Sequence, residues 1–209
     1  MAQVNPNYDT LEAQGTLDGT CVIPSRKSGI DKRTTVEDIK TYVTGLSSKT
    51  LSAGAGFAGA GTIYKTSIAK DGDVYKTTIF IDLTDAKSST TDLDIIGLSG
   101  VSHIGQITAA KNGTLFFGQV TCLETPAGGV TDIDFYSATE GTGAYDGAVA
   151  SLTETVMRTN GGAWSAAAAT QIAFTNLPVA DSYMYLTCGA AGTAGTYTAG
   201  QFMIELWGF

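Results

Sequence analysis

Residues 104–123 read Ile-Gly-Gln-Ile-Thr-Ala-Ala-Lys-Asn-Gly-Thr-Leu-Phe-Phe-Gly-Gln-Val-Thr-Cys-Leu, two alternating runs around Asn112-Gly113. Both turn residues accept the positive φ that a type I′ turn requires, so the pair predicts a two-residue β-hairpin that joins the runs. Leu115 and Phe117 are apolar residues on a face that is otherwise polar. Because side chains alternate along a strand, the register predicts one core-facing set: Ile107, Ala109, Phe116, Val120 and Cys122.

The same alternation predicts a second hairpin nearer the N-terminus. Asp71-Gly72 separates the strands expected at 62–70 and 73–84, with Ile68 opposite Tyr75. The hydrophobic pattern agrees with the register set by this turn, which strengthens the prediction. The side chains expected on the core face are Tyr64, Ile68, Tyr75, Ile79, Ile81 and Leu83.

Further strands are expected at 131–136, 170–177, 182–188 and 199–207, and residues 148–158 are expected to pass from a helical turn into a short strand. In the first of these strands, Ile133 and Phe135 would point inward, and Asp132 and Asp134 toward solvent. About eight short strands without long intervening helices predict an all-β fold. We therefore expect an antiparallel β-sandwich or jelly roll over residues 62–209.

The N-terminal part lacks strand periodicity. Residues 1–33 are punctuated by Gly and Pro and predict an extended arm that needs another surface to lie on, with a tail of no fixed structure as the alternative. Residues 34–46 predict one short helix, capped by Thr34 and carrying a narrow apolar stripe of Val36, Ile39 and Val43. Residues 47–61 are rich in Gly, Ala and Ser and predict a linker.

Composition narrows the function classes. Charged residues make up 15% of the 209 residues, with 26 glycines and a net charge of −8, so nucleic acid is disfavoured as a partner. The first residues have neither the basic region nor the apolar run of a signal peptide, so none is expected, and the sequence lacks the ~18 consecutive apolar residues of a membrane span. Cys21, Cys122 and Cys188 have no metal-like spacing and are expected to be small buried residues in a protein made in a reducing cytoplasm.

Candidate chemistry is sparse, and neither an enzyme nor a bound cofactor is expected. The single histidine, His103, follows Ser102, but nothing around them resembles a nucleophile elbow. Residues 54–59 match the dinucleotide fingerprint, yet they precede a predicted strand instead of following one. No calcium-loop spacing is present, so no metal is expected. The alternative is a Ca²⁺ site built from carboxylates: Asp132, Asp134, Glu140 and Asp146.

Residues 35–43, Thr-Val-Glu-Asp-Ile-Lys-Thr-Tyr-Val, resemble the short helix near the N-terminus of many tailed-phage virion surface proteins. The runs 76–83, 105–113 and 202–209 look like those of structural proteins of marine tailed phages, and the likeness spans most of the chain from residue 62. This resemblance implies a head decoration (cement) protein. Such proteins are made in the host cytoplasm, lie on the capsid exterior against the major capsid protein, lack catalysis and usually assemble as trimers.

The last predicted strand points to an interface. Phe202, Ile204 and Leu206 share one face. The opposite face carries Met203, Trp207 and Phe209, with Glu205 between them. Exposed apolar patches usually mark contact surfaces, so this face predicts a symmetric homo-oligomer, a trimer; a strand buried on both faces of one sandwich is the alternative.

Two functional hypotheses follow from the sequence. The first is a non-enzymatic virion protein that decorates or cements a capsid, with Val36, Ile39 and Val43 anchoring residues 1–46. The second is a binding module of similar shape, such as a carbohydrate-binding domain or a receptor-binding fibre tip.

Overall fold

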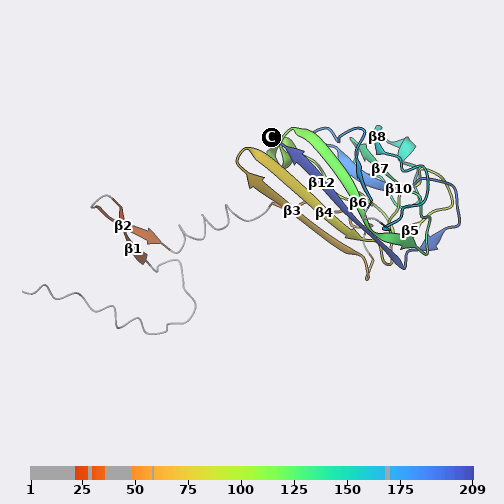
Figure 1. Ribbon diagram of the computed structural model, residues 1–209, viewed down its shortest axis with the longest axis horizontal. Helices are drawn as coiled ribbons and strands as arrows, with labels where there is room; N and C mark the ends of the chain where they lie inside the picture. The colour runs from red at the N-terminus through yellow and green to blue at the C-terminus, as the bar shows by residue number, and fades with distance from the viewer. Residues whose placement is uncertain (1–21, 28–29, 36–48, 58, 168–169) are drawn as a thin grey trace, which may run out of the picture. The chain divides into compact units, whose positions relative to one another are not determined.

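The computed structural model describes residues 22–27, 30–35, 49–57, 59–167 and 170–209. The chain divides into two compact units, Met1–Ser47 and Ser48–Phe209, and each is described by itself (Figure 1). The first unit contributes an antiparallel hairpin of β1 (Val22–Lys27) and β2 (Ile30–Thr35). The second unit contains all the other strands.

The N-terminal hairpin differs from the extended arm that the sequence predicted. Thr34 and Thr35, expected to begin a helix, instead end β2, where they pair with Ile23 and Val22. The rest of the predicted helix, with Val36, Ile39 and Val43, lies outside the described residues, as does Cys21.

The second unit is an all-β antiparallel sandwich, which confirms the predicted fold class. A five-stranded sheet has the order β3-β4-β12-β6-β9, and a three-stranded sheet has the order β10-β7-β8. The five strands are β3 (Ile63–Asp71), β4 (Val74–Asp82), β12 (Ala199–Gly208), β6 (Leu115–Ala127) and β9 (Gln171–Ala173). The other three are β10 (Tyr183–Cys188), β7 (Ile133–Ala138) and β8 (Glu154–Arg158).

Shorter elements complete the domain. A two-stranded pairing joins β5 (Lys87–Ser88) to β11 (Gly195–Thr196). One helical turn, α2 (Ala109–Asn112), precedes β6, and a 3₁₀ turn, η1 (Val149–Ser151), precedes β8. The passage from a helical turn into a short strand predicted for residues 148–158 is therefore confirmed.

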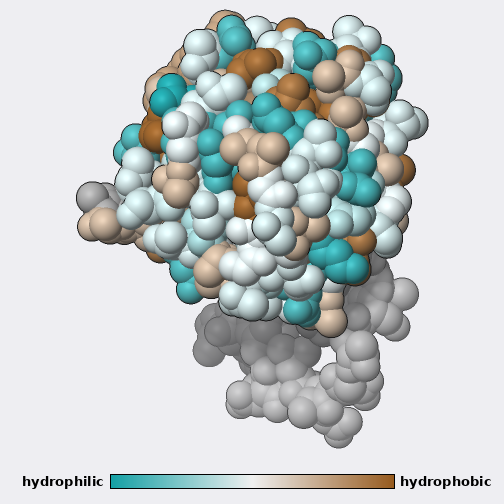
Figure 2. Space-filling view, turned by 90° about the vertical axis from the view of Figure 1, so that its right-hand side faces the viewer, coloured by the Kyte–Doolittle hydropathy of each residue, from teal (hydrophilic) through white to brown (hydrophobic). Residues whose placement is uncertain are grey.

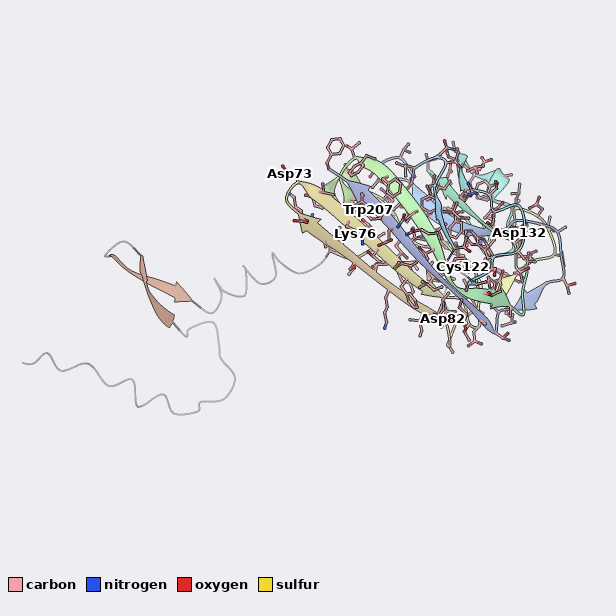
Figure 3. All side chains as sticks on the ribbon, viewed as in Figure 1. Asp73, Lys76, Asp82, Cys122, Asp132 and Trp207 are labelled. Carbon is pink, nitrogen blue, oxygen red and sulfur yellow. The ribbon has the colours of Figure 1, made fainter. Side chains whose placement is uncertain are left out.

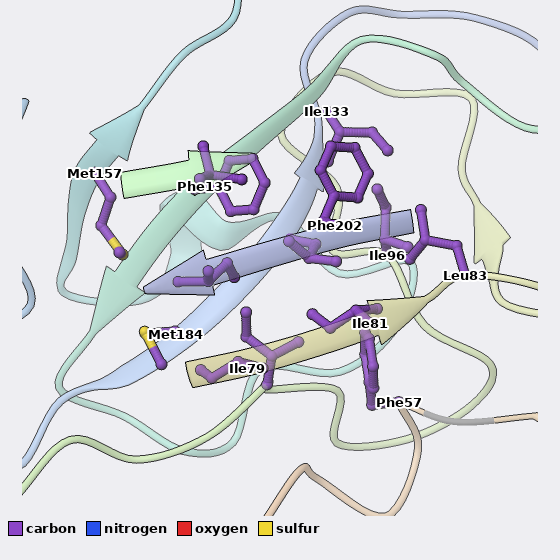
Figure 4. Packing of buried hydrophobic residues seen from close by; sticks show 14 of the residues in the cluster. Phe57, Ile79, Ile81, Leu83, Ile96, Ile133, Phe135, Met157, Met184 and Phe202 are labelled. Atoms are coloured by element: carbon purple, nitrogen blue, oxygen red, sulfur yellow. The ribbon is translucent and has the colours of Figure 1, made fainter. Parts of the chain in front are cut away.

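The main core lies between the two sheets (Figure 4). Phe202 of β12 meets Phe135 of β7 edge-on, with ring centroids 5.8 Å apart, and Trp164 packs against both rings. The Trp164 indole N–H donates to the Ile133 carbonyl at 2.7 Å, so this buried ring leaves no polar atom unsatisfied. Apolar burial of this kind supplies most of the stability of a sandwich.

The strand β7 is buried on both faces. Its second face carries Tyr136 and Ala138, which pack in a smaller cluster with Ile95, Val149 and Tyr185. Ile133 and Phe135 point into the main core, as predicted. The prediction that Asp134 faces solvent was wrong, because loops cover that side of the sheet and leave the residue only 4% exposed.

The β3–β4 hairpin confirms the predicted face but not the predicted turn. Asp71 pairs with Val74, so Gly72 and Asp73 form the loop, and Ile68 lies opposite Thr77 instead of Tyr75. Gly72 has φ of 58°, a value suited to glycine. The register differs from the predicted one by two residues, which is one whole pleat period, so the core-facing residues stay on the same side.

The hairpin predicted over residues 104–123 is wrong. Asn112 ends α2, and of the two expected turn residues only Gly113 has positive φ, at 69°. The buried Asn112 amide accepts from the Thr108 N–H at 2.9 Å and donates to the Thr77 hydroxyl at 2.7 Å, contacts that a type I′ turn does not provide. As a result, β6 pairs with β12 and β9, while residues 104–107 run beside the start of β10.

The segment predicted as a linker packs against the β-domain. Leu51 and Phe57 are buried in the main core. The N–H groups of Gly54 and Gly56 donate to the carbonyls of His103 and Val101. A Cβ at Gly56 would lie 1.4 Å from the Ser99 oxygen, so the glycines of this stretch permit close backbone approach rather than free motion.

Candidate functional site

The outer face of the five-stranded sheet is the most distinctive surface of the β-domain. β12 is a central strand, and its inward residues Phe202, Ile204 and Leu206 are fully buried, as predicted. Alternation turns Met203 and Trp207 to the other side, where both remain half-buried by their neighbours on β4 and β6.

Two pairs of aromatic side chains lie where β12 ends and β6 begins, Phe117 with Trp207 and Phe116 with Phe209, and we call the two pairs together the aromatic cluster. The rings of Trp207 and Phe117, directly opposite in the register, have centroids 5.2 Å apart. Those of Phe116 and Phe209 are 6.0 Å apart. Phe116, Phe117 and Phe209 are 52%, 41% and 66% exposed, values unusual for phenylalanine.

A charged row crosses the sheet next to this cluster. The Lys76 ammonium lies 2.6 Å from one Glu205 oxygen and 5.3 Å from the centroid of the Trp207 ring (Figure 3). The Gln119 amide donates to the other Glu205 oxygen at 2.7 Å. Burial opposes ionisation of Glu205, but the contacts with Lys76 and Gln119 outweigh it and lower the pKa of that carboxyl. The row therefore fixes Lys76 beside the indole.

The residues predicted at an oligomer interface thus occupy one surface. Trp207 and Phe209 belong to the aromatic cluster, and Met203 lies two residues before Glu205 on the same strand face. The sequence placed Phe116 in the core instead. A register shift between Trp207 and Gly208 leaves Phe116 without a partner on β12, and this bulge exposes it. Phe117, an apolar residue on a polar face, was the sequence signal for this surface.

His103 and Ser102 do not act on one another. The Ser102 hydroxyl donates to the Gly100 carbonyl at 2.9 Å. The His103 ring packs against Tyr183 with centroids 4.9 Å apart, and its buried Nδ1 finds no partner among the described residues. Burial lowers the pKa of this imidazole, which favours its neutral form.

The four carboxylates considered for calcium are split into three places. Asp132 and Asp134 lie together at the start of β7, whereas Glu140 accepts hydrogen bonds from Thr153 and Asp146 accepts one from Ser89. Across the described ranges, no group of three or more His, Cys, Asp or Glu side chains is arranged to hold a metal.

The two described cysteines, Cys122 and Cys188, are buried and unpaired with each other. Burial raises the pKa of the Cys188 thiol to about 11, so it stays protonated near neutral pH.

Within the described part of the chain, no helix has the length and apolar character needed to cross a bilayer. Comparison of the whole sequence with protein-family models, with curated proteins and with solved structures found no match.

Proposed function

We propose that this chain is a non-enzymatic virion structural protein that decorates or cements the capsid of a tailed phage from its outer surface. The aromatic cluster is the observation that carries the proposal. Three partly exposed phenylalanines beside a tryptophan form an apolar contact surface on a domain that is otherwise well packed. Exposed patches of this kind mark protein–protein contacts.

The chemistry of this surface suits a lasting protein contact. Aromatic residues are enriched at the centres of interfaces, where a few of them provide most of the binding free energy. Trp207 is already held by Phe117 and Lys76, so little side-chain entropy is lost when a partner covers it. We assign Met203, Trp207 and Phe209 to contacts between copies of the chain in a homotrimer.

The N-terminal region has a separate role in this proposal. Residues 1–46 attach the subunit to the major capsid protein, with Val36, Ile39 and Val43 supplying the apolar contact. This region also holds five of the chain's twelve basic residues: Arg26, Lys27, Lys32, Arg33 and Lys40. These side chains would orient it on an acidic surface.

A second candidate function is a receptor- or carbohydrate-binding module. The observation that favours it is the placement of Trp207 and Phe117 beside the Lys76–Glu205–Gln119 row. An aromatic ring can stack on the apolar face of a sugar while neighbouring polar groups bind its hydroxyls. In that case a fibre or tail protein is the appropriate class.

Quantitative mass spectrometry of purified virions tests both candidates. A copy number comparable to that of the major capsid protein is expected for a decoration protein. A few tens of copies would favour the fibre or tail protein, and absence from the particle would contradict both. The portal protein, present in few copies, provides an internal reference for low abundance.

A further inference from the structure

A second polar feature lies away from the aromatic cluster, on the outer face of the three-stranded sheet. Figure 3 places Asp132 at the end of the domain opposite to Trp207. Figure 2 looks at that end, where hydrophilic and weakly polar side chains predominate over small apolar groups. A hollow of about 490 Å³ opens there between residues 128–132 and 190–194, and Asp132 forms part of its wall.

The register of β7 and β10 gathers oxygen atoms behind this hollow. Thr187 lies directly opposite Asp134, and the Gly189 N–H donates to the Asp132 carbonyl at 2.8 Å. Alternation therefore turns Asp132, Asp134 and Thr187 to one face, with Gly189 among them. Because Gly189 has no side chain, the space above it stays open.

Both carboxylates point into that space. A Cβ placed on Gly189 would lie 2.7 Å from Asp132 Oδ1 and 2.9 Å from Asp134 Oδ1. Any larger residue at this position would fill the space and displace the two oxygens. Gly189 therefore leaves a cradle lined by oxygen atoms.

Two of these oxygens have no partner among the described residues. The Asp132 Oδ1 atom and the Thr187 hydroxyl are both buried without a hydrogen bond, and Thr187 is 0% exposed. Asp134, 4% exposed, accepts one bond, from the Asn160 N–H at 2.7 Å. Buried polar atoms are normally satisfied, so unsatisfied oxygens aimed at one space indicate a missing donor or cation.

The electrostatics favour a cation over a further hydrogen-bond donor. The two carboxylates face one another across the space above Gly189, and the positive charge of Arg158 acts on Asp134. Neither carboxylate forms an ion pair with a residue that the structure describes. A bound cation would neutralise both and would satisfy the free oxygens at the same time.

We propose that Asp132, Asp134 and the Thr187 hydroxyl bind a divalent cation above Gly189, and that calcium is the ion that fits. All three side chains offer oxygen, which hard cations prefer, and calcium accepts irregular sets of six to eight oxygen ligands. Water entering from the hollow, whose wall includes Asp132, completes the shell. Two carboxylates and one hydroxyl form a weak site, with a dissociation constant of about 10⁻⁴–10⁻³ M.

Thermal unfolding of the full chain tests this site. The melting temperature is measured in 1 mM EDTA and in 10 mM CaCl₂ at matched ionic strength, with MgCl₂ as a second cation. Calcium is expected to raise the melting temperature by about 3–10 °C, and magnesium by less. Asp132→Asn and Thr187→Val should each remove most of this rise, whereas the exposed control Asp73→Asn should keep it.

The EDTA measurement separates a cation site from simple repulsion between carboxylates. Asp132→Asn is expected to be at least as stable as the parent chain in EDTA, because it removes a repelling charge, while losing the calcium response. No calcium-specific rise in the parent chain would overturn the proposal. An equal calcium-induced rise in the melting temperature of Asp132→Asn would also overturn it. This comparison decides the outcome even if Thr187→Val does not fold.

Discussion

Replacing Trp207 with alanine separates a contact surface from a core position. Within one subunit the substitution removes an aromatic pair with Phe117, worth about 0.5–1.5 kcal/mol, and the Lys76 contact, worth about 0.5–1 kcal/mol. We therefore expect the isolated β-domain to lose about 1–2.5 kcal/mol. Truncating a fully buried aromatic residue such as Phe202 to alanine should instead lower the free energy of unfolding by about 3–5 kcal/mol.

We expect Trp207→Ala to weaken the association of subunits more than it lowers the free energy of unfolding. A tryptophan at the centre of an interface typically contributes more than about 2 kcal/mol, a loss that weakens association roughly 30-fold. Light scattering over a concentration series measures the oligomer, and urea unfolding of the same samples measures the fold. Lys65→Ala, on the exposed edge strand of the same sheet, serves as the control and should change neither.

Two results would refute this account of Trp207. An unchanged oligomer with an intact fold would place the subunit interface elsewhere. A loss of more than about 4 kcal/mol in unfolding free energy would assign the side chain to the core instead of the surface.

Three further changes test other parts of the structure. Deleting residues 1–46 should leave a folded β-domain that no longer binds capsids in a pelleting assay; unchanged binding would move the anchor elsewhere. Glu205→Gln should cost about 1 kcal/mol at pH 7. The difference should shrink as the pH falls below 4.5, the ordinary pKa of Glu, and vanish below the lowered pKa of the folded protein, because a lowered pKa stabilises only while the carboxylate is ionised. Asn112→Ala should cost about 1–3 kcal/mol in urea unfolding by stranding the Thr77 hydroxyl, whereas the exposed control Asn176→Ala should cost less than about 0.5 kcal/mol.

Alternation within single strands predicted the buried faces well. The alternation in β12 placed Phe202, Ile204 and Leu206 in the core, and the alternation in β4 placed Ile79 and Ile81 there. Side chains alternate along a strand whatever its partner, so the alternation alone determines which face is buried. The predicted β3–β4 hairpin therefore had the correct core-facing residues although its loop residues were wrong.

Features set by distant parts of the chain were not predictable in this way. Asn112-Gly113 carries a hairpin signal, but Thr77, from another sheet strand, binds the Asn112 side chain and stabilises a helical turn. Alternation predicts Asp134 at the surface, but in the structure loops from elsewhere in the sequence cover its face of the sheet and bury it. A bulge opposite Trp207 similarly moved Phe116 from the core to the surface.

The proposed contact surface was therefore only partly predictable from the sequence. Trp207 and Phe209 were predicted as contact residues because they lie on the face of the last strand opposite to its apolar, core-facing side. Phe117 joins them only through the pairing of β6 with β12, whose register no local turn determines.

Hydroxyl-radical footprinting, read out by mass spectrometry, measures whether assembly covers the aromatic cluster by comparing the free monomer, diluted below the concentration at which it associates, with the protein on purified virions. We expect the modification of Trp207, Phe117 and Phe209 to fall at least about tenfold on the particle. The half-buried Tyr145 should react equally in both samples, and the buried Trp164 should react in neither. Equal modification of Trp207 in the free and particle-bound protein would contradict the assignment of this surface to assembly.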